Sequence, residues 1–308
     1  MASLQLNTYF AKGIREGLSE TVADLFADDV PFFAMAEKIK TRNTKHEWQA
    51  DNLSAASITG IIEGAALTYV QPSTRVRVPN YTHIRLRNWD VTFTQMAVEV
   101  AGIKDQVARE MIKAMKALLT DYDKIFLNTG STAVGTTGVA RKARGIQNAI
   151  ITNTGRGSSA GGAVKQALTE SKVNALLQKI WAAGGDPRAL FCHGYQKRVI
   201  STNFTAKTGF SFRIEASART AIANINKYEG SFGTLDVIPD RQHSGARVTV
   251  VTPDHIKVAV LRDIEQYKGA PTASSVKGWV EAEMTLQWGN EKAHGKQSHL
   301  KTSTVAGV

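Results

Sequence analysis

The chain has 308 residues, a formal net charge of +11, 43% hydrophobic residues and one cysteine. This length allows one large domain or two ordinary ones, with enough apolar side chains for a core. No apolar run reaches the ~18 residues that a membrane-spanning helix needs, and residues 1–10 lack a signal-peptide pattern. A single cysteine excludes an internal disulfide and favours synthesis in a reducing cytosol.

Residues 1–45 are expected to form an N-terminal arm. The pattern predicts a short amphipathic helix over residues 18–26, which cannot continue into Pro31 because the residue before a proline disfavours helical geometry. Acidic side chains cluster in this arm: Glu16, Glu20, Asp24, Asp28 and Asp29. By contrast, residues 64–89, 124–169 and 187–214 contain no acid. These basic stretches are either solvated faces or surfaces that meet acidic partners, such as a neighbouring subunit or a polyanion.

Residues 46–90 are expected to form an extended β-hairpin with a turn at residues 79–80. Apolar and arginine side chains alternate on both sides of that turn: Val76, Val78, Ile84 and Leu86 against Arg75, Arg77, Arg85 and Arg87. A two-stranded hairpin is marginal in water, so its apolar face needs a partner. Four arginines without a lysine favour paired contacts at an interface over a solvated face, because guanidinium binds carboxylates at two points.

The rest of the chain predicts a mixed α+β architecture. Residues 91–100 are expected to continue as a strand into a long amphipathic helix at 103–128, with its apolar stripe on its own sheet and its charged face towards neighbours or solvent. The stripe has three-four spacing: Ile103, Val107, Met111, Met115, Leu118, Tyr122 and Ile125. Further on, we expect strands at 146–151, 189–192, 233–238, 247–252, 255–261 and 276–288, and helices at 169–183 and 194–202. A flexible loop is expected at 155–162, and a loose tail after residue 291.

The sequence gives no positive support for catalysis. Gly155-Arg156-Gly157-Ser158-Ser159-Ala160 loosely fits a dinucleotide-binding loop, but no acid follows at the end of the next strand to hold a ribose. Cys192 lies in an apolar strand and fits a core residue better than a nucleophile. The seven histidines lack metal-ligand spacing, and no Gly-x-Ser-x-Gly elbow occurs. We therefore expect no catalytic residue, metal or cofactor; an enzyme with a dispersed site remains the weakest alternative.

Several motifs occur in the order found in one family. They are Asp28-Asp29-Val30-Pro31-Phe32-Phe33, Glu47-Trp48-Gln49-Ala50-Asp51, Glu63-Gly64-Ala65, Arg87-Asn88-Trp89, Tyr228-Glu229-Gly230 and Trp279-Val280-Glu281-Ala282. On these motifs the chain resembles the major capsid (major head) proteins of tailed phages with the Hong Kong 97-type fold. It is most similar to the branch with a Glu-Trp-Gln-x-Asp motif near the N-terminus.

The resemblance implies an α+β subunit with an N-arm, an extended loop, a peripheral domain and an axial domain. These would be residues 1–45 (arm), 46–90 (loop), 91–168 (peripheral domain with spine helix 103–128), 169–265 (axial domain) and 266–308 (return strand and tail). Expected interface residues are Glu47, Trp48, Asp51, Glu63, Arg75, Arg77, Arg85 and Arg87, with Glu16, Glu20, Asp28, Asp29 and Phe32 in the arm.

The resemblance also implies the function and the partners. Pentamers and hexamers of the chain would form an icosahedral head, a virion component made in the host cytoplasm, which encloses double-stranded DNA non-specifically. Portal, scaffolding or decoration proteins are expected as partners, and no membrane. Some relatives cross-link through a lysine of the extended loop or carry a scaffolding segment before the arm. No lysine lies between Lys45 and Lys104 and the arm motif comes early, so neither is expected. The alternative is an encapsulin-type cellular cage around an enzyme.

Overall fold

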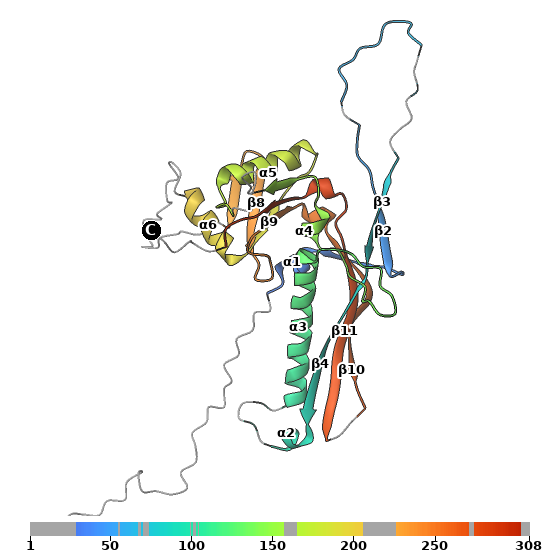
Figure 1. Cartoon of the computed structure of the whole chain (residues 1–308), viewed down its shortest axis with the longest axis vertical. Helices are drawn as coiled ribbons and strands as arrows, with labels where there is room; N and C mark the ends of the chain where they lie inside the picture. Colours follow the sequence, from blue (N-terminus) through green and yellow to red (C-terminus); the bar gives the residue numbers. More distant parts are fainter. Residues whose placement is uncertain are drawn as a thin grey trace, which may run out of the picture.

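The computed structural model describes residues 29–54, 56–66, 69, 74–98, 100, 103, 105–156, 165–205, 226–270 and 274–302. A long helix lies along one sheet, a second sheet with its own helices lies at one end, and a narrow two-stranded ribbon projects from the body (Figure 1). The helix predicted at 18–26, the arm residues Glu16, Glu20 and Asp28, and most of the loop predicted at 155–162 lie outside the described residues.

The first sheet has the order β1-β10-β11-β4, from Glu37–Lys40, Lys257–Lys268, Ser275–Gln287 and His83–Thr92. Strand β1 runs parallel to β10, and the other pairs are antiparallel. Helix α3 (Gln106–Asn128) packs on one face and begins at Asp105, whose carboxylate accepts from Ala108 N at 3.0 Å. Four alternate side chains of β11 are fully buried: Val280, Ala282, Met284 and Leu286. Their period-two spacing places all four on one face of the sheet, the face under the helix.

The predicted long helix is confirmed, beginning three residues later than expected. Leu118 and Tyr122 of the predicted stripe are fully buried, and the Tyr122 hydroxyl donates to the carbonyl oxygen of Ala282 at 2.6 Å. Met115 was assigned to the stripe but is 38% exposed, whereas Phe126 is fully buried. No side chain of the helix before Ala114 is buried, so the buried stripe does not continue to the N-terminus of the helix.

The second sheet has the order β5-β12-β9-β6-β8-β7. Its strands are Thr154–Arg156, Gly295–Ser298, Val248–Val251, Ala189–Cys192, Gly233–Pro239 and Lys227–Gly230 in that order. Helices α5 (Glu170–Ala182) and α6 (Gly194–Thr205) accompany it, and α5 ends before Gly184, whose φ of +85° suits glycine. Leu176, Ile180 and Leu190 lie in a second hydrophobic core here. The helix after Thr169 and the strand at 189–192 match the sequence prediction.

The predicted hairpin around residues 79–80 is wrong. Strand β3 (Val76–Tyr81) pairs with β2 (Lys45–Ala50), and the chain runs on through Thr82 into β4, which pairs with β11. Asn80 is fully buried, and its side-chain amide donates to the carbonyl oxygens of Leu286 and Arg144 at 2.7 and 3.2 Å. Pro79 is tolerated because its strand belongs to a two-stranded ribbon, where each strand has an edge.

Three further sequence predictions are corrected. The strand expected over 91–100 ends at Thr92, whose hydroxyl caps the short helix α2 (Phe93–Ala97). The apolar run at 146–151 begins with helix α4 (Ile146–Ala149), since a short apolar run alone does not distinguish helix from strand. The tail after residue 291 is ordered as far as residue 302: it forms the 3-10 helix η2 (Glu291–Ala293) and β12, with His294 fully buried between them.

Strand exchange between the sheets also changes the expected boundaries. Strand β10 lies in the first sheet, so the boundary expected at residue 265 falls inside it, and β12 of the C-terminal region joins the second sheet. Two short helices complete the described structure of this region. Helix α1 (Pro31–Met35) packs against α3, and the 3-10 helix η1 (Pro253–His255) precedes β10 in the chain.

Candidate subunit interface

The foot of the β2–β3 ribbon is fixed to the body by Trp48. Its indole N–H donates to the carbonyl oxygen of Gly289 at 2.7 Å, and its ring lies edge-on to Trp288 with centroids 4.8 Å apart. His46 contacts Gln287 beside it at 2.7 Å. Gly289 has a φ of +58°, and a Cβ there would lie 2.7 Å from His255 Nδ1, so this turn requires glycine. Trp48 therefore holds the ribbon against the end of β11.

Charged side chains pair along and across the ribbon but stay in solvent. Glu47 Oε1 lies 2.6 Å from Lys45 Nζ, and Glu47 Oε2 lies 3.8 Å from Arg77 Nη1. Arg75 Nε lies 3.7 Å from Asp51 Oδ2. The hydrogen bond from Lys45 lowers the pKa of the Glu47 carboxyl. Arg75 and Arg77 keep 70% and 72% of their side-chain surface exposed, so these pairs add little stability. Both guanidinium groups remain accessible to a partner.

The segment beyond the ribbon exposes large apolar side chains. Between 76% and 104% of the surface is exposed at each of these residues: Leu53, Ile58, Ile61, Ile62 and Tyr69. Glu63, expected at an interface, lies exposed among them. The segment extends well away from the body (Figure 1), so its apolar groups have no core of their own to enter. A concentration of exposed aliphatic and aromatic groups on a protruding loop is typical of a protein–protein contact.

Arg85 and Arg87 face the long helix of their own chain. The carboxylate of Asp121 on α3 accepts a hydrogen bond from Arg85 Nε at 2.7 Å. It also accepts two from Arg87, from Nε at 2.7 Å and from Nη2 at 2.6 Å. The alternate residues Ile84 and Leu86 point away from the helix and are 42% and 49% exposed. The predicted alternation is therefore present, but the arginine face is the inner one. Both arginines stay 41% exposed, and their contact with a neighbour remains a prediction.

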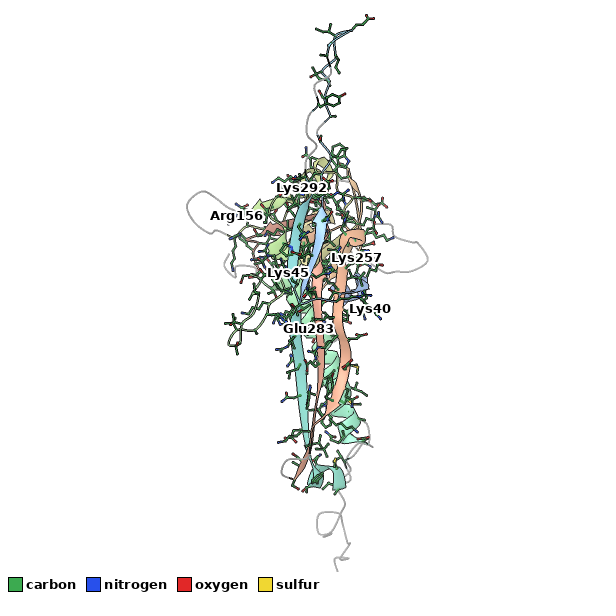
Figure 2. All side chains as sticks on the ribbon, turned by 90° about the vertical axis from the view of Figure 1, so that its right-hand side faces the viewer. Lys40, Lys45, Arg156, Lys257, Glu283 and Lys292 are labelled. Atoms are coloured by element: carbon green, nitrogen blue, oxygen red, sulfur yellow. The ribbon has the colours of Figure 1, made fainter. Side chains whose placement is uncertain are left out.

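The outer face of the first sheet carries an ionic cluster around Glu283, which is labelled in Figure 2 and lies opposite Ile84 in the register of β11 and β4. The Glu283 side chain is 5% exposed; it lies 2.5 Å from Arg141 and 3.2 Å from Arg262, and it accepts from the Thr82 hydroxyl at 2.6 Å. Arg262 also pairs with Glu281. The loop that supplies Arg141 forms a hollow of about 350 Å³ with Ile84, Val134 and Val139. Val134 and Val139 are more than half exposed, so this hollow has an apolar rim.

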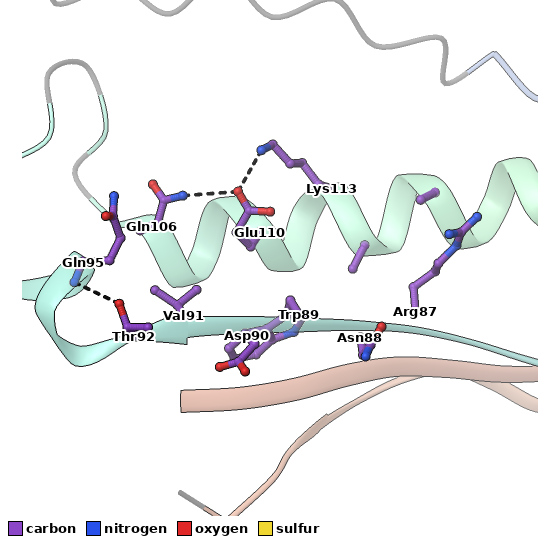
Figure 3. A pocket seen from close by; sticks show the side chains of 12 residues that line it. Arg87, Asn88, Trp89, Asp90, Val91, Thr92, Gln95, Gln106, Glu110 and Lys113 are labelled. Atoms are coloured by element: carbon purple, nitrogen blue, oxygen red, sulfur yellow. Dashed lines mark hydrogen bonds and ion pairs between the residues drawn. The ribbon is translucent and has the colours of Figure 1, made fainter. Parts of the chain in front are cut away.

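A cleft of about 460 Å³ lies between β4 and the N-terminal half of α3 (Figure 3). Glu110 lies on its helix side, bonded to Lys113 at 2.7 Å and to Gln106 Nε2 at 3.2 Å. Trp89 Nε1 and Gln106 Oε1 are buried and have no hydrogen-bond partner among the described residues. Most buried polar groups have a hydrogen-bond partner, so these two atoms are unusual.

The described end of the N-terminal arm enters the body between the two sheets. Phe32 is fully buried and packs edge-on against Phe191 with centroids 5.3 Å apart. The backbone N–H of Phe33 donates to Asp123 on α3 at 2.8 Å. Asp29 stays exposed and lies 3.5 Å from Arg241. The arm thus contacts helix α3, the second sheet and a surface arginine within five residues of chain.

Sequence reasoning missed the internal partners of these groups. Asp121, Asp123, Asp240 and Glu283 had no assigned role, because each meets a partner far away along the chain. Within the described part of the chain, no group of three His, Cys, Asp or Glu side chains could hold a metal ion. The same residues include no helix that is long and apolar enough to cross a membrane. Cys192 is fully buried, and burial raises the pKa of its thiol to about 12.

The model of the SU10 major capsid protein family matches residues 3–301, nearly the whole chain. The chain belongs to this family. The capsid protein of cyanophage A-1(L) is similar in fold, with 11% identity, a TM-score of 0.71 and coverage of 94% of this chain and 98% of that one. The capsid of a native GTA particle shows 12% identity, a TM-score of 0.66 and coverage of 97% and 100%. No curated protein matches the sequence.

Family and fold identify a major capsid protein of the tailed-phage type, with the Hong Kong 97-type fold that the sequence predicted. A structural rather than catalytic role follows from that membership. The SrpI encapsulin of Synechococcus elongatus PCC 7942 shares the fold at 9% identity and a TM-score of 0.60, over 95% of each chain.

Proposed function

We propose that the chain builds an icosahedral phage head from pentamers and hexamers, with its extended loop lying on a neighbouring subunit. The supporting observation is the loop itself. Leu53, Ile58, Ile61, Ile62 and Tyr69 are almost fully exposed on a segment that has no core of its own. Burial of apolar surface stabilises a protein by about 25 cal/mol per Å². This loop gains that free energy only when another molecule covers its apolar side chains. A second copy of the chain is the partner that a closed shell always provides.

Two surfaces on the neighbouring copy of the chain could receive that loop. The cleft between α3 and β4 has a volume of about 460 Å³ and is lined by polar side chains of both elements, among them Asp90, Glu110 and Lys113. The hollow around Ile84, Val134 and Val139 offers an apolar rim. The exposed Arg75 and Arg77 at the loop foot, together with Glu47 and Asp51, would supply the charged contacts at the edge of such an interface.

The domain roles follow the family resemblance with adjusted boundaries. Residues 1–45 form the arm, residues 46–82 include the extended loop and its ribbon, and the four-stranded sheet with α3 forms the peripheral domain. The six-stranded sheet with α5 and α6 forms the axial domain, which lies around the symmetry axes. Strand exchange through β10 and β12 ties the two domains of one subunit together.

The net charge of +11 suits a wall around packed double-stranded DNA, held without sequence specificity. The shell is a virion component produced in the host cytoplasm, with portal, scaffolding or decoration proteins as further partners. It is held together without lysine cross-links from the extended loop, which has no lysine between Lys45 and Lys104.

A cellular cage is the second candidate, because the SrpI encapsulin shares the fold. Electron microscopy of the expressed, purified protein tests both proposals at once. Closed icosahedral shells are expected. Soluble subunits that show an enzymatic activity would refute both proposals. The contents of shells isolated from the native source then separate the two. DNA of uniform length supports a phage head, whereas a co-purifying enzyme supports the cage.

A further inference from the structure

A basic cleft of about 550 Å³ lies where the C-terminal end of α3 meets the connection between β8 and β9. Its cationic side chains come from separate elements: Lys124 from α3, and Arg241 and Arg247 from the connection. His193, which follows β6, also lines it. No carboxylate lines the cleft, and among the described residues none contacts Lys124 or Arg247.

The positive charge around the cleft is poorly compensated. Arg247 Nη1 donates a hydrogen bond to the amide oxygen of Gln147 at 3.0 Å. This acceptor is uncharged, so it does not neutralise the guanidinium group. Nearby, burial and the charges of Arg247 and Arg156 lower the pKa of the Lys296 ammonium. Asp29 lies at the edge of the cleft, with its Oδ2 3.5 Å from Arg241 Nε. An anion in the cleft would relieve this repulsion between like charges.

The chain supplies such an anion directly before Asp29. Glu16, Glu20, Asp24 and Asp28 follow one another at intervals of four residues, and no Lys or Arg occurs from residue 16 to 29. On a helix this spacing would place all four carboxylates along one line of about 18 Å. Like charges four apart repel, so that arrangement needs cations beside it. Because Asp29 already lies at the cleft, Asp28 is only one Cα step of about 3.8 Å away.

We infer that the acidic segment of the same chain, residues 16–28, docks along this basic cleft with its carboxylates against Lys124, Arg241 and Arg247. The docked segment would fix the entry of the arm to the joint between the two sheets. Continuity at Asp29 favours the chain's own segment over any other polyanion. The contact lies within one chain, so it does not depend on shell formation and can be measured on unassembled subunits.

Cleavage by a glutamate-specific protease at Glu16 and Glu20 tests this contact on the full chain. We expect slow cleavage in low salt, and acceleration of about tenfold in the variant Lys124→Gln/Arg241→Gln/Arg247→Gln, the combined effect of three exposed ion pairs. High salt should accelerate cleavage of the wild type similarly. The control variant Lys227→Gln/Lys179→Gln, on the opposite edge strand and on α5, should cleave at the wild-type rate.

Reversal of charge on both sides tests whether the contact is direct. Arg241→Glu/Arg247→Glu should lose protection, and adding Glu20→Lys/Asp24→Lys should restore it, with Glu16 as the remaining cleavage site. Equal cleavage of the wild type and the neutralised variant would overturn the inference. So would protection that disappears on nuclease treatment, which would assign the cleft to nucleic acid, or on dilution, which would assign the segment to another copy. Shell formation is scored separately by sedimentation, so failure here leaves the proposed assembly untouched.

Discussion

The carboxyl groups of Asp123 and Asp240 face each other in the interior and join helix α3 to the residue that follows β8. They are 0% and 2% exposed, and each is hydrogen-bonded to the other. Neither Oδ2 accepts a hydrogen bond from an N–H or a hydroxyl of a described residue. A proton shared between the two carboxyl groups would satisfy both atoms. The other oxygens accept from the backbone N–H groups of Phe33 and Gln242, at 2.8 and 2.7 Å.

This acid pair should make the subunit less stable as the pH rises. Burial, followed by the negative charge of Asp240, raises the pKa of Asp123 to about 8, and burial also raises the pKa of Asp240 despite His193 nearby. The folded chain therefore binds a proton that the unfolded chain releases near pH 4. The stabilisation is complete below about pH 4 and is lost as the pH rises to about 8, with a slope of about 1.4 kcal/mol per pH unit for one proton.

Thermal unfolding of unassembled subunits between pH 5 and 8 measures this slope. Asp123→Asn keeps an acceptor for Phe33 N–H and supplies a donor to Asp240, so it should flatten the profile and raise the melting temperature at pH 8. Asp236→Asn, on the exposed side of β8, is the matched control and should keep the wild-type slope. A wild-type profile that is flat over this range would contradict the shared proton.

Trp48 should control the position of the extended loop. Trp48→Ala removes both the hydrogen bond to Gly289 and the ring contact with Trp288, a loss of about 3 kcal/mol for a buried aromatic. We expect faster tryptic cleavage at Arg75 and Arg77, and fewer shells. Trp48→Phe keeps a ring and should fall between this variant and the wild type. Trp181→Ala, at a site 62% exposed, is the control; equal cleavage in all variants would refute the role of Trp48.

The tip of the loop should matter for assembly but not for folding. Ile61→Asp/Ile62→Asp places charge on side chains that have almost no contacts in their own subunit. The melting temperature of the subunit should stay within about 2 °C of the wild type, as expected for a surface change, while shells disappear from sedimentation profiles. Thr59→Asp introduces one charge on the same loop without removing an aliphatic group. Wild-type yields of shells from the double variant would exclude the loop as an apolar contact.

The arginines of the two predicted strands should behave differently. Charge reversal at the exposed pair, Arg75→Glu/Arg77→Glu, should block assembly and leave the subunit folded. Arg87→Glu should destabilise the subunit itself by about 1–2 kcal/mol, since it breaks a two-point contact with the largely buried Asp121. Urea unfolding and shell yield, measured on the same samples, separate the two effects. Equal loss of stability in both variants would contradict this division.

Shells should dissociate without breaking covalent bonds. The extended loop has no lysine, so boiling assembled shells in detergent should release a single band at the mass of the chain, 33.4 kDa. A ladder of higher bands that persists under reducing conditions would show a cross-link from another lysine. Replacement of Cys192 is unnecessary in this experiment, because its thiol is buried.

Local patterns were sufficient for several elements. Three-four spacing predicted the long helix, and local patterns also predicted the helix at 169–183 and the strand at 276–288, where α5 and β11 lie, because each depends on contacts within a few residues of chain. The order of motifs was sufficient for the family and its fold. Alternation also separated the arginines of β4 from its apolar residues.

Alternation could not show which face of β4 lies inside. That choice depends on Asp121, which contacts Arg87 only when α3 packs on the sheet. The arginine face of β4 therefore lies inside and the apolar face lies outside. The true ribbon was missed for the same reason: β3 pairs with a strand about 30 residues earlier, and the buried Asn80 resembled a turn signal. The sequence by itself determined the long helix, α5, β11 and the family, since these follow from local spacing and motif order. Only the tertiary structure decided strand partners, the inner face of β4 and the Asp123–Asp240 pair, because each requires groups distant in the chain to share one buried space.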